Sequence, residues 1–112
     1  MKYEQLSNIK IEDFDNLTYD SSVPVLVFFG AARCQVCKEL LPTVEDVLKD
    51  YSDRMNSFWV DVDEYKTLAT RFRLRGIPHL LLFNGGEIRD RASGLVEREL
   101  LINKIENVLN EQ

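Results

Sequence analysis

The sequence predicts an α/β fold in which a mixed sheet lies between two layers of helices. Three observations lead to this prediction. The hydrophobic pattern alternates regularly between the spacing of strands and the spacing of helices along the chain. Residues 25–29 and 80–83 are apolar without interruption, which is typical of strands that are covered on both faces. The turn signal Asn84-Gly85-Gly86 then joins the second of these strands to an antiparallel neighbour.

In the first half of the chain, strands and helices are expected to alternate. Residues 3–7 indicate a weak strand, and Ile11, Phe14 and Leu17, spaced by three, indicate a short amphipathic helix. Residues 25–29 form a central strand. A long helix follows from residue 37 to residue 51, because its apolar residues share one face: Leu40, Leu41, Val44, Val47, Leu48 and Tyr51. Pro42 should kink this helix, since an interior proline removes a backbone hydrogen bond.

The second half of the chain continues the alternation. Residues 57–62 are rich in β-forming side chains and predict a strand, and residues 65–72 predict a short helix. The strands at residues 80–83 and 87–92 form the hairpin. The last helix covers residues 97–110, where Leu101, Ile105 and Val108 recur at helical spacing. The predicted order of elements is βαβαβαββα.

The length and charge of the chain restrict its class. With 112 residues it is expected to be a single domain, residues 1–112, whose core needs neither a disulfide nor a metal to fold. Its net charge of −5 is opposite in sign to that of a typical nucleic-acid binder. Residues 1–5 do not have the pattern of a signal peptide, and no apolar run approaches the ~20 residues of a membrane span. We therefore expect a cytoplasmic protein that binds neither nucleic acid nor membranes.

The motif Cys34-Gln35-Val36-Cys37 carries the chemistry of the chain, and these are its only two cysteines. It follows a buried strand and opens the long helix, so the sulfur of Cys34 is expected at the helix N-terminus. Unpaired N–H groups and the positive end of the helix dipole favour a thiolate there, and Arg33 and Lys38 add positive charge. Cys37 lies about one turn deeper. The exposed thiolate can attack a substrate disulfide, and the deeper thiol can resolve the mixed disulfide.

Two other interpretations of this motif remain open. A C-x-x-C pair can be half of a zinc site, but four ligands are normally needed and only His79 could join the cysteines. The two cysteines could also be buried and chemically inert. Redox chemistry is the interpretation that we favour.

The segment Gly76-Ile77-Pro78-His79 comes directly before the second buried strand. A cis bond before Pro78 is one way to turn the chain into this strand. On its own the segment favours an ordinary trans turn proline, so the evidence for a cis bond comes from combining it with the cysteine motif.

The motifs Arg33-Cys34-Gln35-Val36-Cys37-Lys38, Asp61-Val62-Asp63 and Arg75-Gly76-Ile77-Pro78 occur in this order with specific spacing. The apolar residues 25–29 precede the first motif, and Pro42 comes five residues after Cys37. Residues 81–87 and Gly94 follow the last motif. Together these features resemble the thioredoxin family over nearly the whole chain.

The resemblance implies a thioredoxin fold, with a mixed central sheet of about five strands and about four helices on its two faces. It makes Cys34 the nucleophile and Cys37 the resolving cysteine of a redox-active disulfide, so no other cofactor and no metal is expected. It also makes Pro78 a cis-proline that faces the cysteines, and Ile77 a backbone partner for an extended substrate peptide. The substrate groove is expected to include Arg33, Gln35, Val36, Ile77, Pro78, Gly94 and Leu95.

The chain departs from the family pattern beside the cysteines. Typical members have Trp-Cys-Gly-Pro-Cys, where this chain has Arg33-Cys34-Gln35-Val36-Cys37, and Gly30 stands where a tryptophan is usual. Phe28 replaces a buried aspartate and Trp59 replaces the lysine that often pairs with it. Losing both charged partners together can be neutral for stability. We therefore expect no carboxylate beneath Cys37.

Two further features have competing interpretations. His79, where the family usually has threonine, is a candidate proton shuttle if it lies near the sulfurs, but its side chain could face the opposite side of the strand. Arg71, Arg73 and Arg75 form either a solvated surface run or a docking patch for acidic partners.

The sequence therefore predicts a monomeric thiol–disulfide oxidoreductase that acts on protein disulfides through Cys34 and Cys37. The chain has no nucleotide-binding signature, so a separate electron donor resembling thioredoxin reductase should regenerate its reduced form. The alternative is a binding or assembly module of the same fold that has no general reductase activity.

Overall fold

Five strands form one mixed sheet in the computed structural model, which describes residues 3–111. Met1, Lys2 and Gln112 of the predicted domain therefore lie outside the described residues. Along the chain the strands are β1 (Ser7–Asn8), β2 (Val25–Gly30), β3 (Asn56–Asp61), β4 (His79–Asn84) and β5 (Glu87–Ser93). Their order in the sheet is β1-β3-β2-β4-β5, so β2 is the central strand that its unbroken apolar sequence predicts.

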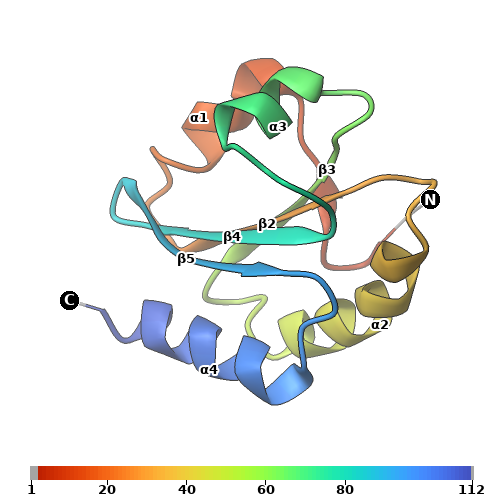
Figure 1. Cartoon of the computed structure of the whole chain (residues 1–112). Coiled ribbons are helices and arrows are strands. Elements are labelled where there is room, and N and C mark those ends of the chain that lie inside the picture. Colours follow the sequence, from red (N-terminus) through yellow and green to blue (C-terminus); the bar gives the residue numbers. More distant parts are fainter. Residues whose placement is uncertain (1–2, 112) are drawn as a thin grey trace.

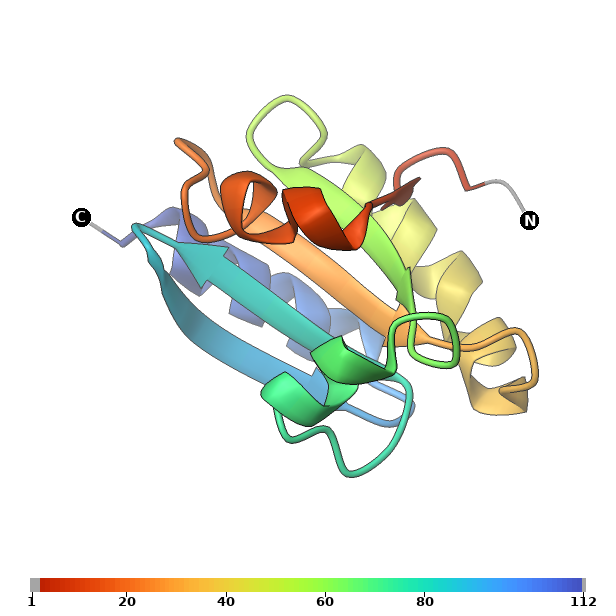
Figure 2. The same cartoon turned by 90° about the horizontal axis from the view of Figure 1, so that it is seen from above.

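Helices cover both faces of this sheet. They are α1 (Phe14–Leu17), which follows the 3-10 turn η1 (Ile11–Asp13), α2 (Gln35–Lys49), α3 (Lys66–Arg71) and α4 (Arg98–Leu109). Figure 1 shows α1 and α3 on one face and α2 and α4 on the other, and Figure 2 shows the strands running beneath α1 and α3. The predicted α/β fold class, with a mixed sheet of five strands and four helices, is confirmed.

The strand register places alternate side chains in two separate cores. β1 and β2 are parallel to β3, β4 is antiparallel to β2, and β5 is antiparallel to β4. Phe28, Leu80 and Leu82 point toward α2 and α4 and share a core with Cys37. Phe29 and Leu81 belong to the other core, beneath α1 and α3.

The hairpin between β4 and β5 has the predicted turn. Gly85 and Gly86 have φ of 61° and 82°, the left-handed conformation that a two-residue hairpin turn needs and that glycine adopts without strain. A β-bulge follows, because Phe83 pairs with Ile88 whereas Leu82 pairs with Asp90. The bulge shifts the register of β5 by one residue along the rest of the hairpin.

The first strand differs from its prediction. Residues 3–7 were expected to be extended, but β1 contains only Ser7 and Asn8. The backbone N–H groups of Gln5 and Leu6 donate instead to the carboxylate of Glu45 on α2, at 2.9 Å each. This side chain takes the donors that a longer strand would have used, so the prediction for residues 3–6 is wrong.

Candidate active site

Cys34 occupies the N-terminus of α2, as its sequence context predicts. It is the N-cap residue of this helix, with an extended backbone conformation. Its sulfur accepts a hydrogen bond from the backbone N–H of Cys37 at 3.1 Å. The side chain is half-buried, and it contacts both cores at the end of the sheet. A sulfur in this position has a backbone donor and the helix dipole to stabilise negative charge.

Cys37 is placed differently, although it is only three residues away. Its side chain is fully buried in the core between the sheet and α2. Burial, together with the hydrogen bond to the Cys34 sulfur, raises the pKa of the Cys37 thiol to about 12. Both cysteines are free thiols in this structure. One accessible and one buried sulfur within one turn is the arrangement that a dithiol needs to act in two steps.

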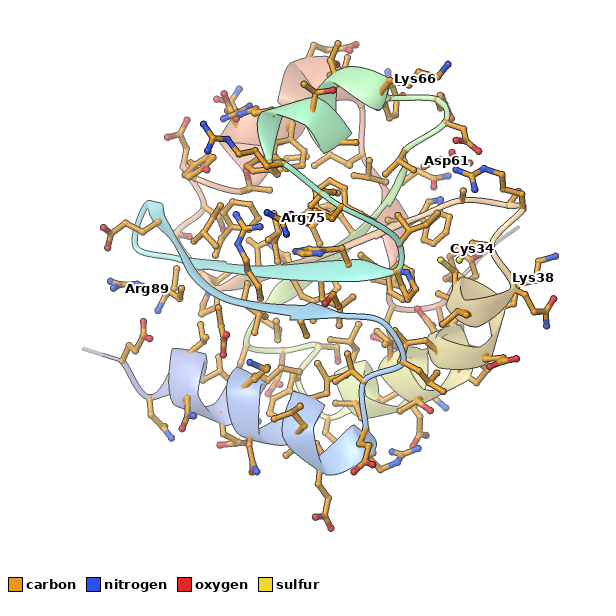
Figure 3. The ribbon with its side chains drawn as sticks, viewed as in Figure 1. Cys34, Lys38, Asp61, Lys66, Arg75 and Arg89 are labelled. Atoms are coloured by element: carbon orange, nitrogen blue, oxygen red, sulfur yellow. The ribbon has the colours of Figure 1, made fainter. Side chains whose placement is uncertain are left out.

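The charge on Arg33 does not act on the cysteines alone. Its Nε and Nη2 donate to the carboxylate of Asp63 at 2.8 and 3.1 Å. This bidentate pair lowers the pKa of the Asp63 carboxyl. The positive charge that Arg33 adds beside the cysteines is thus partly offset by a carboxylate partner. Lys38, at the start of α2, is exposed (Figure 3).

The Ile77–Pro78 peptide bond is cis, as predicted. Pro78 is buried, and its carbonyl accepts a hydrogen bond from the N–H of Gly94 at 3.0 Å. This bond joins two of the segments that carry predicted groove residues. Ile77, Pro78 and Gly94 line one cavity. The exposed side chains of Val36 and Leu95 supply apolar surface.

A second cavity, of about 370 Å³, lies beside Cys37. Tyr3 and Trp59 line it, with their rings 5.4 Å apart, and so do Asn8, Lys38 and Asp61. Cys34, Lys38 and Asp61 lie on the same side of the molecule (Figure 3). No pattern in the sequence indicates this cavity, because Tyr3 and Trp59 meet only once the segment before β1 lies against β3.

Phe28 and Trp59 lie directly opposite each other on β2 and β3, with ring centroids 5.3 Å apart. None of the hydrogen bonds among residues 3–111 joins Cys37 to a carboxylate. Asp61 lines the cavity, but its Oδ1 accepts from the backbone N–H groups of Asp63 and Glu64. The hydrogen bonds of residues 3–111 agree with the expectation that no carboxylate lies beneath Cys37, which stays a prediction.

Gly30 makes room for Trp59. A Cβ at Gly30 would lie 2.7 Å from Cη2 and from Cζ3 of Trp59, and 3.0 Å from Cε1 of Phe28. The missing side chain at Gly30 and the large side chain at Trp59 therefore form a matched pair. The indole ring of Trp59, on the neighbouring strand β3, occupies the space that a side chain at Gly30 would need.

Gly30→Ala is therefore expected to destabilise the protein by about 1–3 kcal/mol, the usual cost of overpacking a core. Thermal unfolding measures the effect, and each kcal/mol should lower Tm by roughly 4–8 °C. Gly76→Ala is the matched control, since an added Cβ there meets nothing within 4 Å and the backbone is not left-handed. Equal Tm values for the two variants would contradict the matched-pair interpretation.

His79 does not lie beside the resolving thiol. It pairs with Phe29 in the sheet, so its side chain lies on the face of α1 and α3, whereas Cys37 is on the face of α2. Its Nε2 is 3.5 Å from Nη1 of Arg91. Burial, followed by the charge of Arg91, lowers the pKa of His79. The structure thus agrees with the interpretation in which His79 faces the opposite side of its strand, and gives the proton-shuttle hypothesis no support.

The arginine cluster predicted from the sequence is divided in the structure. Arg71 pairs with Asp15 at 2.8 Å and lies over the rings of Phe14, Tyr19 and Phe72. Arg73 and Arg75 instead line the cavity of Ile77 and Pro78 together with Arg91, a residue that the sequence did not single out.

Among residues 3–111 there is no group of three His, Cys, Asp or Glu side chains arranged to hold a metal ion. No helix in the described part of the chain has the length and apolar character needed to cross a membrane.

Comparison with known proteins agrees with the geometry of the site. The family model described as Thioredoxin matches residues 5–107. The chain is 33% identical over 101 residues to "Thioredoxin" of Rickettsia bellii, covering 90% of this chain and 96% of that protein. It is 33% identical over 107 residues to "Thioredoxin M4, chloroplastic" of Arabidopsis thaliana. That alignment covers 96% of this chain but only 55% of the plant protein.

A third relative, "Thioredoxin 1" of Synechococcus elongatus, is 33% identical over 96 residues, which cover 86% of this chain and 90% of that protein. These matches do not favour the alternative of a binding module without reductase activity. The chain belongs to the thioredoxin family, and it is a thiol–disulfide oxidoreductase with a Cys-x-x-Cys pair.

Proposed function

We propose that the protein reduces disulfide bonds in other proteins, with Cys34 as the attacking nucleophile and Cys37 as the resolving thiol. The observation that carries this assignment is the unequal placement of the two sulfurs. The sulfur of Cys34 is accessible and accepts the N–H of Cys37 at 3.1 Å, whereas Cys37 is buried behind it. Only the Cys34 sulfur can meet a large substrate.

The reaction proceeds in two exchanges. The Cys34 thiolate attacks one sulfur of the substrate disulfide, which forms a mixed disulfide and releases the other substrate sulfur as a thiolate. Cys37 then loses its proton and attacks the Cys34 sulfur, so that the second substrate sulfur leaves. Two electrons pass to the substrate, and the protein is left with a Cys34–Cys37 disulfide.

The second exchange is limited by the proton on Cys37. Burial raises the pKa of this thiol to about 12, and no carboxylate hydrogen-bonds to it among residues 3–111. We propose that the proton leaves to water in the cavity beside Tyr3 and Trp59, which at about 370 Å³ can hold water and has polar groups in its wall. The rate of this exchange is therefore expected to rise with pH.

We further propose that the substrate lies in an extended conformation against Ile77. Among residues 3–111, neither the N–H nor the carbonyl of Ile77 has a hydrogen-bond partner, so both can pair with a peptide. Six further residues complete the groove: Arg33, Gln35 and Val36, which precede the buried cysteine, and Pro78, Gly94 and Leu95. Val36 and Leu95 would contact apolar side chains of the substrate, since both are exposed.

The remaining assignments concern the cellular setting. We propose that the protein acts as a monomer in the cytoplasm, that residues 1–112 form one domain, and that an electron donor resembling thioredoxin reductase recycles it. The bacterial thioredoxins among its relatives support a cytoplasmic location, whereas the plant relatives are named chloroplastic.

Reduction of insulin with dithiothreitol as the electron source tests the proposed disulfide reduction directly, because reduced insulin B chain precipitates. An absence of acceleration over dithiothreitol alone would contradict the proposal.

Alkylation tests the roles of the two sulfurs. Iodoacetamide is expected to modify the reduced, folded protein once, at Cys34, because the Cys37 side chain is fully buried. Peptide mass spectrometry locates the label, and the same treatment in denaturant, where both thiols should react, is the control. Faster labelling of Cys37 than of Cys34 in the folded protein would show that the roles are reversed.

A further inference from the structure

Three arginines surround the cavity in which the substrate backbone is proposed to lie. Arg73, Arg75 and Arg91 line a space of about 520 Å³ together with Ile77, Pro78 and Gly94. We call Arg73, Arg75 and Arg91 with this cavity the arginine groove. Among the described residues, no acidic side chain lines it. In Figure 3, Arg75 lies on the same side of β4 as α3.

The groove contains the arginines that lack an acidic partner. The chain has 19 acidic side chains, and among residues 3–111 every arginine outside the groove has a carboxylate within 4 Å. These paired arginines are Arg33, Arg54, Arg71, Arg89 and Arg98. Arg73, Arg75 and Arg91 have none in the described residues. In a protein of net charge −5 this is a local concentration of uncompensated positive charge.

Contacts with the surrounding backbone constrain two of the three arginines, Arg73 through its main chain and Arg91 through its side chain. Arg73 has φ of 54°, a left-handed conformation that costs a non-glycine residue free energy, and its N–H donates to the carbonyl of Thr70. Arg91 Nη1 donates to the carbonyl of Phe72 at 3.4 Å, which directs its guanidinium toward the groove.

From these observations we infer that the arginine groove selects disulfide substrates in which acidic residues flank the cysteine that Cys34 attacks. This inference rests on the proposed function and adds the substrate class of the same site. A peptide extended along Ile77 passes this groove, and its aspartate or glutamate side chains would pair with the three guanidinium groups. Guanidinium groups suit this role because they bind carboxylates in bidentate geometry and stay charged over the working pH range.

Matched peptide substrates test the inference. Each peptide carries one internal disulfide, and the residues beside one cysteine are two glutamates, two glutamines or two lysines. Two sets, with these residues before or after the cysteine, cover both directions of a chain along Ile77. The measured quantity is kcat/KM for reduction by the full-length protein, with dithiothreitol as the recycling reductant.

The wild-type protein is expected to favour the glutamate peptide over the glutamine peptide by roughly fivefold at low ionic strength in at least one set. The lysine peptide should be the slowest. At about 1 M salt, where the screening length is about 3 Å, the three peptides should become equal. Equal values of kcat/KM at low ionic strength would overturn the inference and leave the proposed function intact.

Variants locate the effect. Arg73→Gly removes a charge and relieves the left-handed residue, and Arg75→Gln and Arg91→Gln each remove a charge without a large change in size. Each should lower kcat/KM for the glutamate peptide by about twofold and change kcat/KM for the glutamine peptide by less. Arg89→Gln is the control, since Arg89 lies at the other end of the sheet from Cys34 (Figure 3). A preference that survives all three groove substitutions, or that Arg89→Gln removes equally, would overturn the inference.

Failure of the proposed function has a different signature. In that case none of the peptides is reduced faster than by dithiothreitol alone. Binding of peptides with serine in place of both cysteines then tests the groove on its own, through NMR shifts of the backbone amides of Gly76 and Gly94. Larger shifts with the glutamate peptide than with the glutamine peptide would support the inference, and equal shifts would overturn it.

Discussion

Replacing Cys34 with serine should abolish disulfide reduction, leaving only the background rate of dithiothreitol. The serine hydroxyl can accept the N–H of Cys37 as the Cys34 sulfur does, so α2 should keep its N-cap. The variant should therefore be folded, but a hydroxyl cannot replace a thiolate in attack on a disulfide. Insulin reduction measures the loss, and thermal unfolding shows that the fold is retained. Activity above the background in this variant would refute the assignment of the nucleophile.

Replacing Cys37 with serine should have a different outcome. The attack by Cys34 remains, but the second exchange has no thiol, so the mixed disulfide with the substrate should accumulate. Mass spectrometry under non-reducing conditions detects this adduct when the protein is mixed with a peptide disulfide and no other thiol. Cys34→Ser under the same conditions should form no adduct, because its remaining thiol, on Cys37, is buried. An adduct on Cys37 would reverse the two roles.

The sequence predicted the layers of the fold because its strongest patterns are decided by burial. The strand with the unbroken apolar run, β2, lies at the centre of the sheet. The two helices with clear apolar spacing, α2 and α4, cover one face of the sheet. The weak first strand was predicted incorrectly for a reason that no local pattern contains. The carboxylate of Glu45, about 40 residues away, binds the backbone N–H groups that a longer β1 would have used.

The cysteine pair could be predicted from the sequence, whereas the arginine groove could not be predicted in full. A regular hairpin through Asn84 and Glu87 would pair Arg91 with Leu80, on the face of α2 and α4. The bulge in β5 instead pairs Arg91 with Leu81, which turns its side chain to the face of α1 and α3. There it reaches His79. One inserted residue thus decides the face on which Arg91 lies.

Phe28→Asp should produce the largest change in stability of any single substitution considered. Phe28 is fully buried, packs against Trp59 with ring centroids 5.3 Å apart, and shares a core with Cys37. Removing a buried phenylalanine ring costs about 3–5 kcal/mol, and the introduced carboxylate must be desolvated as well. Phe28→Asn is the matched control, because its amide has a similar size and does not titrate.

The pH dependence of this loss has a definite sign. Burial should raise the folded-state pKa of the introduced carboxylate above its unfolded value of about 3.9. Below that value the group is neutral in both states, and Phe28→Asp should resemble Phe28→Asn. As the pH rises toward the folded-state pKa, the unfolded state releases the proton first, so Phe28→Asp should become steadily less stable than Phe28→Asn. Chemical unfolding of both variants from about pH 4 to pH 8 measures the difference, and a constant difference would mean that the carboxylate is not desolvated.

The same substitution should accelerate the second exchange near neutral pH. The Cys37 thiol has a pKa raised by burial to about 12 and no carboxylate bonded to it in the described chain, so its deprotonation is expected to limit resolution. A carboxylate at position 28, with a raised pKa, could accept this proton as a general base. The rate of substrate release in a single turnover, followed from pH 6 to pH 9, should then rise at lower pH in Phe28→Asp than in the wild type. Phe28→Asn should keep the wild-type profile.

If Phe28→Asp does not fold at neutral pH, adding Trp59→Lys places a positive partner on the neighbouring strand and should restore folding. Identical profiles in folded forms of all these proteins would show that proton transfer from Cys37 does not limit the reaction.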